Sequence, residues 1–268
     1  MSNDKYIGIF DSGMGGLTVV KSIIRSMPNE NIIYFGDTAH VPYGTRSKEQ
    51  ITEYVLNDVA FLSGFDIKAI VIACNTADSI ARKEVEKRYT LPVFGVVEPA
   101  AKEAVQKTKN GRIGVIATDA TVKSGAYEKT IARYSDTALV FSNACPLLVP
   151  LVENGRFRRG DGVIEAVLKE YLEPLRQQNI DTLVLGCTHY PLLHDLIADI
   201  LPGIAIISSS DAAASALSSA LCDQGLLNAG TGGSRKYFVS DRPDSFCEQA
   251  QIFMGDADKN MTVELADV

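Results

Sequence analysis

The sequence lacks the features that would mark a disulfide framework, a zinc site or a membrane span. Its five cysteines are few, odd in number and widely separated, and none forms a CxxC pair. No run reaches the roughly 18 apolar residues that a membrane helix needs. The first residues show no basic segment followed by an apolar one, so no signal peptide is indicated. We therefore expect a cytoplasmic protein with reduced thiols, no bound metal and no membrane association.

The chain also lacks any long run of lysine or arginine. Its formal net charge is −7 and its pI is about 5.1, whereas a nucleic-acid-binding protein usually presents a basic face. The nearest basic cluster, Arg156, Arg158 and Arg159, is more simply a solvated loop. We therefore expect no nucleic-acid partner. An acidic ligand would need a pocket that is locally rich in hydrogen-bond donors.

What the sequence does contain is an alternation of short apolar runs with amphipathic segments. Its 268 residues are enough for one large or two small domains. The apolar runs are nearly continuous, as in parallel strands that are covered on both faces. Strands are predicted at 6–10, 31–36, 69–73, 93–97, 112–117, 137–142, 182–186, 204–208 and 236–239. Helices are predicted between them at 17–26, 48–63, 78–88, 100–107, 125–134, 161–177 and 192–200.

This alternation predicts a doubly wound α/β architecture, and a weak internal repeat divides it into two halves. Residues 7–13 resemble 113–119, and residues 71–76 resemble 184–189, at similar sequence offsets. We expect two α/β domains related by pseudo-two-fold symmetry. The first would comprise residues 1–97 and 207–268, and the second residues 98–206. Matching strand ends would meet at a shared cleft, where we expect the active site.

Two cysteines occupy equivalent places in this repeat. Cys74 follows the strand predicted at 69–73, and Cys187 follows the strand predicted at 182–186. Open α/β sheets bind ligands at the carboxyl ends of their strands. Each cysteine precedes small polar residues whose backbone N–H groups, near a helix N-terminus, would hold an anion and lower a thiol pKa. Either cysteine alone could be a buried structural residue, but the matched pair favours a functional role.

Other polar residues accompany the two thiols. Residues 11–16, Asp-Ser-Gly-Met-Gly-Gly, follow the first strand, but they match neither a Walker loop nor GxGxxG, and turn chemistry explains them equally well. His189 lies two residues beyond the second thiol, where it could exchange protons with it. Tyr43 in the loop 42–45 could belong to the core or to a lid. Glu153 could be an ordinary exposed acid.

Together these motifs resemble one family, the glutamate racemases of the aspartate/glutamate racemase superfamily. The combination of DSGxGG with CNT and GCTHYPL is highly specific. Residues after about 210 carry no motif that matches. The matching segments are IGIFDSGMGGLTV (7–19), GDTAHVPYGTRS (36–47), IACNTADS (72–79), GVVEPA (95–100), CPLLVPLVENG (145–155) and LVLGCTHYPLL (183–193).

The resemblance implies a cofactor-independent isomerase that interconverts L- and D-glutamate and supplies D-glutamate for peptidoglycan synthesis, and so for cell-wall biogenesis and cell shape. Cys74 and Cys187 would be the acid/base pair, with Asp11 assisting Cys74, and with Glu153 and His189 assisting Cys187. A cytoplasmic homodimer is implied as well. The residues implied to hold glutamate are Asp11, Ser12, Pro42, Tyr43, Gly44, Asn75, Thr76, Thr188 and His189.

Racemisation gives a physical reason for two thiols. A proton must leave one face of Cα while another arrives on the opposite face, and two thiols that flank Cα can do both. Without pyridoxal phosphate as an electron sink, the carbanionic transition state depends on donors around the carboxylate. We expect Asn75, Thr76, Thr188 and nearby backbone N–H groups to supply them.

Three alternatives stay open at this point. The first is the same reaction on aspartate, because one methylene is worth only about 1–3 kcal/mol of discrimination. The second is a cysteine hydrolase or thiol redox enzyme, which gives no reason for a matched second cysteine. The third is a non-catalytic module that binds an amino acid or an anion.

Overall fold

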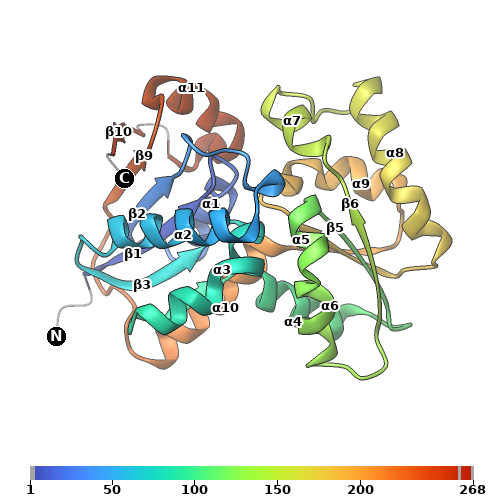
Figure 1. Ribbon diagram of the computed structural model, residues 1–268, viewed down its shortest axis with the longest axis horizontal. Helices are drawn as coiled ribbons and strands as arrows, with labels where there is room; N and C mark the ends of the chain where they lie inside the picture. The colour runs from blue at the N-terminus through green and yellow to red at the C-terminus, as the bar shows by residue number, and fades with distance from the viewer. Residues whose placement is uncertain (1–3, 259–260, 267–268) are drawn as a thin grey trace.

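The chain folds around two separate parallel β-sheets, as the computed structural model in Figure 1 shows. The structure describes residues 4–258 and 261–266. One sheet has the strand order β10-β9-β2-β1-β3-β4, and the other has the order β6-β5-β7-β8. Neighbouring strands are parallel in both sheets. The predicted α/β class with parallel sheets is therefore confirmed.

The larger sheet is formed by both ends of the chain. Alternate residues of its central strand enter different cores, since Ile7 and Ile9 pack into one and Phe10 into the other. This double covering explains why its strands read as continuous apolar runs. The strands are β1 (Tyr6–Asp11), β2 (Asn31–Gly36), β3 (Ile67–Ile72), β4 (Val93–Gly95), β9 (Arg235–Val239) and β10 (Val263–Leu265).

Helices cover both faces of the larger sheet. On one face α1 (Leu17–Ser26) packs against α10 (Ser209–Asp223) and α11 (Pro243–Met254). On the other face α2 (Lys48–Leu62) packs against α3 (Asn75–Arg88). The segment after residue 210, which carries no recognisable motif, thus supplies most of α10 and all of α11.

The smaller sheet is built from the middle of the chain, drawn in green to orange in Figure 1. Its strands are β5 (Arg112–Ala117), β6 (Leu139–Ala144), β7 (Thr182–Gly186) and β8 (Ala205–Ser208). Among its helices, α4 packs with α6, and α8 packs with α7 and α9. The helices are α4 (Val97–Lys107), α5 (Asp119–Ser124), α6 (Ala126–Ala132), α7 (Leu148–Glu153), α8 (Gly162–Gln177) and α9 (His194–Ile200).

The two sheets repeat one order of strands. The run β2-β1-β3-β4 corresponds to β6-β5-β7-β8, and Cys74 follows β3 as Cys187 follows β7. This order agrees with the internal repeat in the sequence. The domain boundaries stay a prediction. The expected boundary between residues 206 and 207 lies within β8, and the next strand of the larger sheet is β9.

Local differences from the predicted elements occur where the backbone changes direction. The segment 93–97 is a strand only as far as Gly95, because α4 begins at Val97. The helix predicted at 125–134 is α6, which starts at Ala126 because Gly125, with a φ of 62°, separates it from the unpredicted helix α5. Strand β10 and helices α7 and α11 were not delimited from the sequence. No helix in residues 4–258 and 261–266 is long and apolar enough to cross a membrane.

Candidate active site

Cys74 lies directly before α3, and its side chain is almost enclosed. The residue is 6% exposed. Its Sγ lies 3.5 Å from the Oγ of Ser12, and the Ala77 N–H donates to the sulfur. Burial, followed by the charge of Asp11, raises the pKa of Cys74 to about 12 despite these contacts. The neutral thiol is therefore the favoured form at this position.

Asp11 ends β1 and is buried beside the first thiol. Its Oδ2 accepts the Gly13 N–H at 3.0 Å. Its Oδ1 is buried without a hydrogen-bond partner among the described residues. Burial raises the pKa of Asp11, and the charge of His189 opposes that rise. A buried, unpartnered carboxyl oxygen is uncommon in folded proteins and marks a place where a proton or donor can be received.

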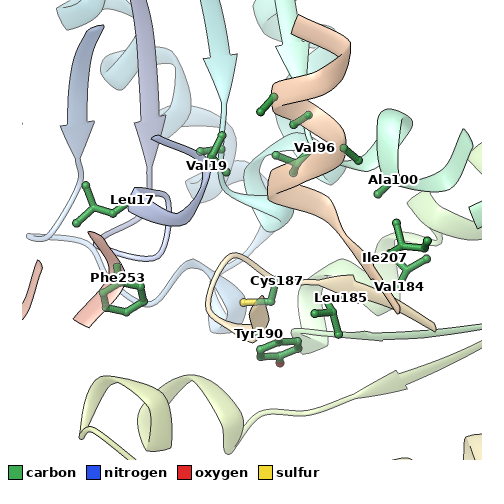
Figure 2. Close-up of a cluster of buried hydrophobic side chains, with 14 of the residues drawn as sticks. Leu17, Val19, Val96, Ala100, Val184, Leu185, Cys187, Tyr190, Ile207 and Phe253 are labelled. Carbon is green, nitrogen blue, oxygen red and sulfur yellow. The ribbon is translucent and has the colours of Figure 1, made fainter. Parts of the chain in front are cut away.

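Cys187 follows β7 and has an imidazole beside it. Its Sγ lies 3.7 Å from Nδ1 of His189, whose Nε2 lies 2.9 Å from Oε1 of Glu153. Burial alone would lower the pKa of His189, but the hydrogen bonds and charges of Cys187 and Glu153 raise it to about 10. An imidazolium in this position stabilises a neighbouring thiolate. In Figure 2 Cys187 lies near Leu185 and Tyr190, with its sulfur directed to the side on which Phe253 lies.

The two half-sites adjoin through their loops. A Cβ at Gly15 would lie 2.3 Å from Thr188 Oγ1 and 2.5 Å from His189 Cε1, so only glycine permits this approach. Thr18 Oγ1 lies 2.9 Å from the Thr188 carbonyl oxygen. The charge of Cys187 also contributes to the raised pKa of Cys74. The loop after β1 and the loop after β7 therefore form one site between the two sheets.

Asn75 and Thr188, two of the predicted ligand donors, are buried at this junction. Asn75 Oδ1 accepts from the Tyr127 hydroxyl at 2.7 Å, and its Nδ2 donates to Ser209 Oγ at 3.2 Å. Thr188 is 3% exposed and contacts the loop that carries Ser12. Tyr127 and Ser209 were not predicted from the sequence. They lie in α6 and α10, which no motif connects with the thiols.

Thr76 brings a second pair of unpredicted residues into the site. Its Oγ1 lies 2.9 Å from Thr118 Oγ1 and 3.3 Å from Thr121 Oγ1. Thr118 follows β5 as Ser12 follows the end of β1. The internal repeat pairs these two hydroxyl residues, so it contains a signal that could have identified Thr118. Thr118 Oγ1 accepts the N–H of Thr121 and thereby caps the N-terminus of α5.

The turn that contains Pro42 and Gly44 reaches the same region. A Cβ at Gly44 would lie 3.2 Å from Thr118 Cβ, so this turn packs closely on the end of β5. Tyr43 begins the 3-10 turn η1 (Tyr43–Thr45) and is 1% exposed. Its hydroxyl hydrogen-bonds to two buried aspartates, Asp37 and Asp58. Because this hydroxyl is already hydrogen-bonded, Tyr43 can contact a ligand only through its backbone.

Helix α11 closes the site on the side of His189. The rings of His189 and Phe253 meet edge to face with centroids 5.4 Å apart. The sequence offered no signal for Phe253, because its helix carries no motif and lies far along the chain. A hollow of about 770 Å³ lies elsewhere, lined by residues of α3 to α6, and neither thiol lines it. Among the described residues, no group of three or more His, Cys, Asp or Glu side chains is placed to hold a metal ion.

Comparison with known proteins identifies the family to which the chain belongs. Residues 7–217 match the family model described as Asp/Glu/Hydantoin racemase. A glutamate racemase from Persephonella marina is 48% identical over 249 residues, which cover 93% of this chain and 93% of that one.

Solved structures extend the similarity to the whole fold. A glutamate racemase from Bacillus anthracis has a TM-score of 0.94 and 39% identity, covering 99% of this chain and 98% of that one. A glutamate racemase from Francisella tularensis, solved in complex with D-glutamate, has a TM-score of 0.91 and 37% identity over 99% of this chain and 98% of that one. The chain therefore belongs to the Asp/Glu/hydantoin racemase family and, within it, to the glutamate racemases, which are amino-acid isomerases.

Proposed function

We propose that this chain interconverts L- and D-glutamate by proton transfer between Cys74 and Cys187, which act on opposite faces of the Cα atom. The observation that carries the proposal is the meeting of two thiol half-sites at the ends of equivalent strands, β3 and β7. Inversion needs one group that removes a proton and another that supplies one to the opposite face. A hydrolase or a binding module has no use for the second thiol.

The two thiols would begin the reaction in different protonation states. The pKa of about 12 at Cys74 favours the thiol there. The imidazolium of His189 favours a thiolate at Cys187. Cys187 would then take the Cα proton of one enantiomer while Cys74 donates to the other face.

The reverse direction requires the opposite states, a thiolate at Cys74 and a thiol at Cys187. Asp11, with its unpartnered Oδ1, is suited to receive the proton that Cys74 gives up. His189, hydrogen-bonded to Glu153, is suited to return a proton to Cys187. A group that transfers the reacting proton directly contributes about 10²–10⁴-fold to a rate, and in this proposal that role belongs to the two thiols.

Donors from both halves would hold the substrate. Asn75 and Thr76 at the start of α3, together with Thr188, offer side-chain N–H and O–H groups near a helix N-terminus. The Pro42–Gly44 turn would add backbone N–H groups. The same donors would stabilise the negative charge that develops when Cα loses its proton. Ser12, Asp11 and His189 complete the set that we assign to substrate binding.

We assign glutamate rather than aspartate as the substrate, because a similar enzyme from Francisella tularensis was solved in complex with D-glutamate. The mechanism uses only side chains and backbone of this chain, so we propose that it needs no metal and no pyridoxal phosphate. We further propose that the protein acts as a homodimer in the cytoplasm. Its D-glutamate would serve peptidoglycan synthesis and thereby cell-wall biogenesis and cell shape.

Solvent exchange tests the proposal. Wild-type protein incubated with L- or D-glutamate in D₂O should incorporate deuterium at Cα as it inverts the centre, and should act much more slowly on aspartate. Cys187→Ala protein with near-native turnover would exclude the two-thiol mechanism. Glutamate binding without any exchange would indicate a binding module instead, and a stoichiometric acyl-enzyme would indicate a hydrolase.

A further inference from the structure

A buried group of polar side chains lies behind the Pro42–Thr45 turn and outside the thiol site. The hydroxyl of Tyr43 lies 2.6 Å from Asp37 Oδ2 and 3.0 Å from Asp58 Oδ2. All three residues are at most 2% exposed. We call Tyr43, Asp37 and Asp58 the Tyr43 network. Two carboxyl groups in one buried place are costly unless hydrogen bonds or a proton offset their repulsion.

The hydrogen count of this network identifies the protonated group. The Tyr43 hydroxyl has one hydrogen and can donate it to only one of the two carboxyl oxygens. Asp37 also accepts from Ser240 Oγ at 2.8 Å and lies 2.8 Å from His40 Nδ1, so its negative charge is well supported. Asp58 has Tyr43 as its one hydrogen-bonding side chain in the part of the chain that the structure describes.

The pKa of Asp58 agrees with this count. Burial, followed by repulsion from Asp37, raises the pKa of Asp58 well above its usual value. Every donor and acceptor of this contact is paired when Asp37 is ionised and Asp58 is neutral. Tyr43 then donates to Asp37, and the carboxylic acid of Asp58 donates to the Tyr43 oxygen.

The network is connected to the proposed active site on two sides. The Asp37 N–H donates to the carbonyl oxygen of Asp11 at 2.9 Å, at the end of β1. On the other side Gly44, next to Tyr43, packs on Thr118 at the end of β5. Asp58 belongs to α2, whose inner face is part of the core. The Tyr43 side chain thus anchors the turn to a helix that takes no part in the chemistry.

We propose that Asp58, as a neutral acid, is a positioning residue for substrate binding. By donating to Tyr43 it holds the Pro42–Thr45 turn where the backbone N–H groups of that turn meet a substrate carboxylate. This inference rests on the proposed function for the identity of the substrate. Because Asp58 acts through the turn and not on either thiol, its loss should change the KM for glutamate much more than kcat.

The test compares Asp58→Asn, Asp58→Ala and Tyr43→Phe in the full chain. Asparagine is neutral and keeps a donor at the right place, so Asp58→Asn should keep KM within about twofold of wild type. Asp58→Ala and Tyr43→Phe remove a buried hydrogen bond and should raise KM roughly five- to tenfold with little change in kcat. Tyr237→Phe is the matched control, because it removes a 2.8 Å bond to Asp258 that does not touch the turn.

Amide hydrogen exchange gives a second readout that needs no substrate. The Arg46 N–H donates to the Tyr43 carbonyl oxygen at 3.0 Å, so its protection reports the turn. It should exchange roughly tenfold faster in Asp58→Ala and Tyr43→Phe, and unchanged in Asp58→Asn and Tyr237→Phe. This holds even if wild-type protein proves inactive on glutamate, so failure of the proposed function and failure of this inference can be told apart.

Three results would overturn the inference. Asp58→Asn with as large a KM increase as Asp58→Ala would show that Asp58 acts as a charge. Unchanged KM and unchanged Arg46 exchange in Asp58→Ala and Tyr43→Phe would show that the network does not position the turn. A fall in kcat at constant KM would place the effect on the chemical step instead.

Discussion

The Cys74 and Cys187 half-sites are built at equivalent strand ends, yet each thiol has a different chemical environment. Cys74 contacts a hydroxyl, that of Ser12, and lies near the buried carboxyl group of Asp11. Cys187 contacts an imidazole, which a carboxylate holds from behind. Burial and the charge of Asp11 raise the pKa of Cys74, whereas Cys187 has beside it the imidazole of His189, whose pKa is raised. The repeat therefore determines where the thiols lie, and the residues around them give each thiol different neighbouring charges.

Replacing either thiol has the largest expected effect. Cys74→Ala and Cys187→Ala should each lose inversion by at least about 10³-fold, and the serine variants should retain little, because a hydroxyl is a far weaker acid than a thiol. The remaining thiol still faces one side of Cα. Each alanine variant should therefore exchange the Cα proton of one enantiomer in D₂O, and the two variants should choose opposite enantiomers, as NMR would show. Exchange of the same enantiomer by both would mean that the thiols do not flank Cα.

Separating the half-sites should have the next largest effect. A Cβ at Gly15 would meet Thr188 and His189 at 2.3 and 2.5 Å, so Gly15→Ala must push the two loops apart. A displacement near 1 Å costs about 10²-fold in rate, and we expect a loss of that order in kcat/KM. Gly162→Ala is the control, since a Cβ there has no atom within 4 Å. Equal activity of the two variants would show that the contact between the loops is not needed.

Removing the charge of Glu153, which hydrogen-bonds to His189 beside Cys187, should change the pH dependence of kcat/KM. The pKa of His189, about 10, depends in part on Glu153, so Glu153→Gln should lower it. The imidazolium is lost as pH rises through its pKa, and the alkaline limb of kcat/KM should therefore move to lower pH in this variant. We expect a loss of roughly tenfold or more above neutral pH. Glu173→Gln, which removes an exposed partner of Arg176, should leave the limb in place; a limb unmoved in both variants would contradict the role of Glu153.

The same pKa has a consequence for folding. Because the pKa of His189 is raised above its ordinary 6.5 to about 10, its contribution to stability is present below pH 6.5 and is lost as pH rises through 10. The unfolding free energies of the wild type and of Glu153→Gln should thus differ most below about pH 6.5 and converge above about pH 10. A difference in unfolding free energy that grew with rising pH would contradict this role of the His189 pKa.

Replacing Asp11, which lies beside Cys74, should have the smallest effect on kcat/KM. It is also the most direct test of whether the two half-sites differ. The equilibrium constant between enantiomers is one, so Asp11→Asn must lower kcat/KM equally in both directions, by roughly tenfold. The asymmetry can still be measured as the Cα-deuterium isotope effect on each enantiomer. It should grow for the enantiomer whose proton Cys74 removes. Equal isotope effects from both enantiomers would count against the assignment of Asp11 to Cys74.

Local patterns were sufficient to predict much of the fold and the candidate thiols. Continuous apolar runs identify strands covered on both faces, and the predicted bounds of β2, β5, β7 and α1 agree with the structure. Cys74 and Cys187 could be singled out because a cysteine that follows such a run lies at a strand end. Gly125 was a missed local signal, since its left-handed conformation ends α5, a helix that was not predicted, just before α6 begins.

The contacts that join distant segments could not be predicted in this way. Phe253 reaches His189, and Ser209 reaches Asn75, from helices that carry no motif. The direction of the Tyr43 side chain was equally undetermined, because a tyrosine beside a glycine is compatible with a core and with a lid. Such contacts depend on how whole helices pack against the sheets, and that information is spread over many weak apolar contacts.

The sequence by itself determined the α/β class, the repeat and the pair of cysteines at matching strand ends, because each of these is written in short segments. Only the tertiary structure decided that Gly15 brings the two half-sites into contact, that Glu153 hydrogen-bonds to His189 beside Cys187, and that the hydroxyl of Tyr43 is buried against Asp58. The physical reason is that burial and neighbouring charges set protonation. Both arise only when residues far apart in sequence are packed together.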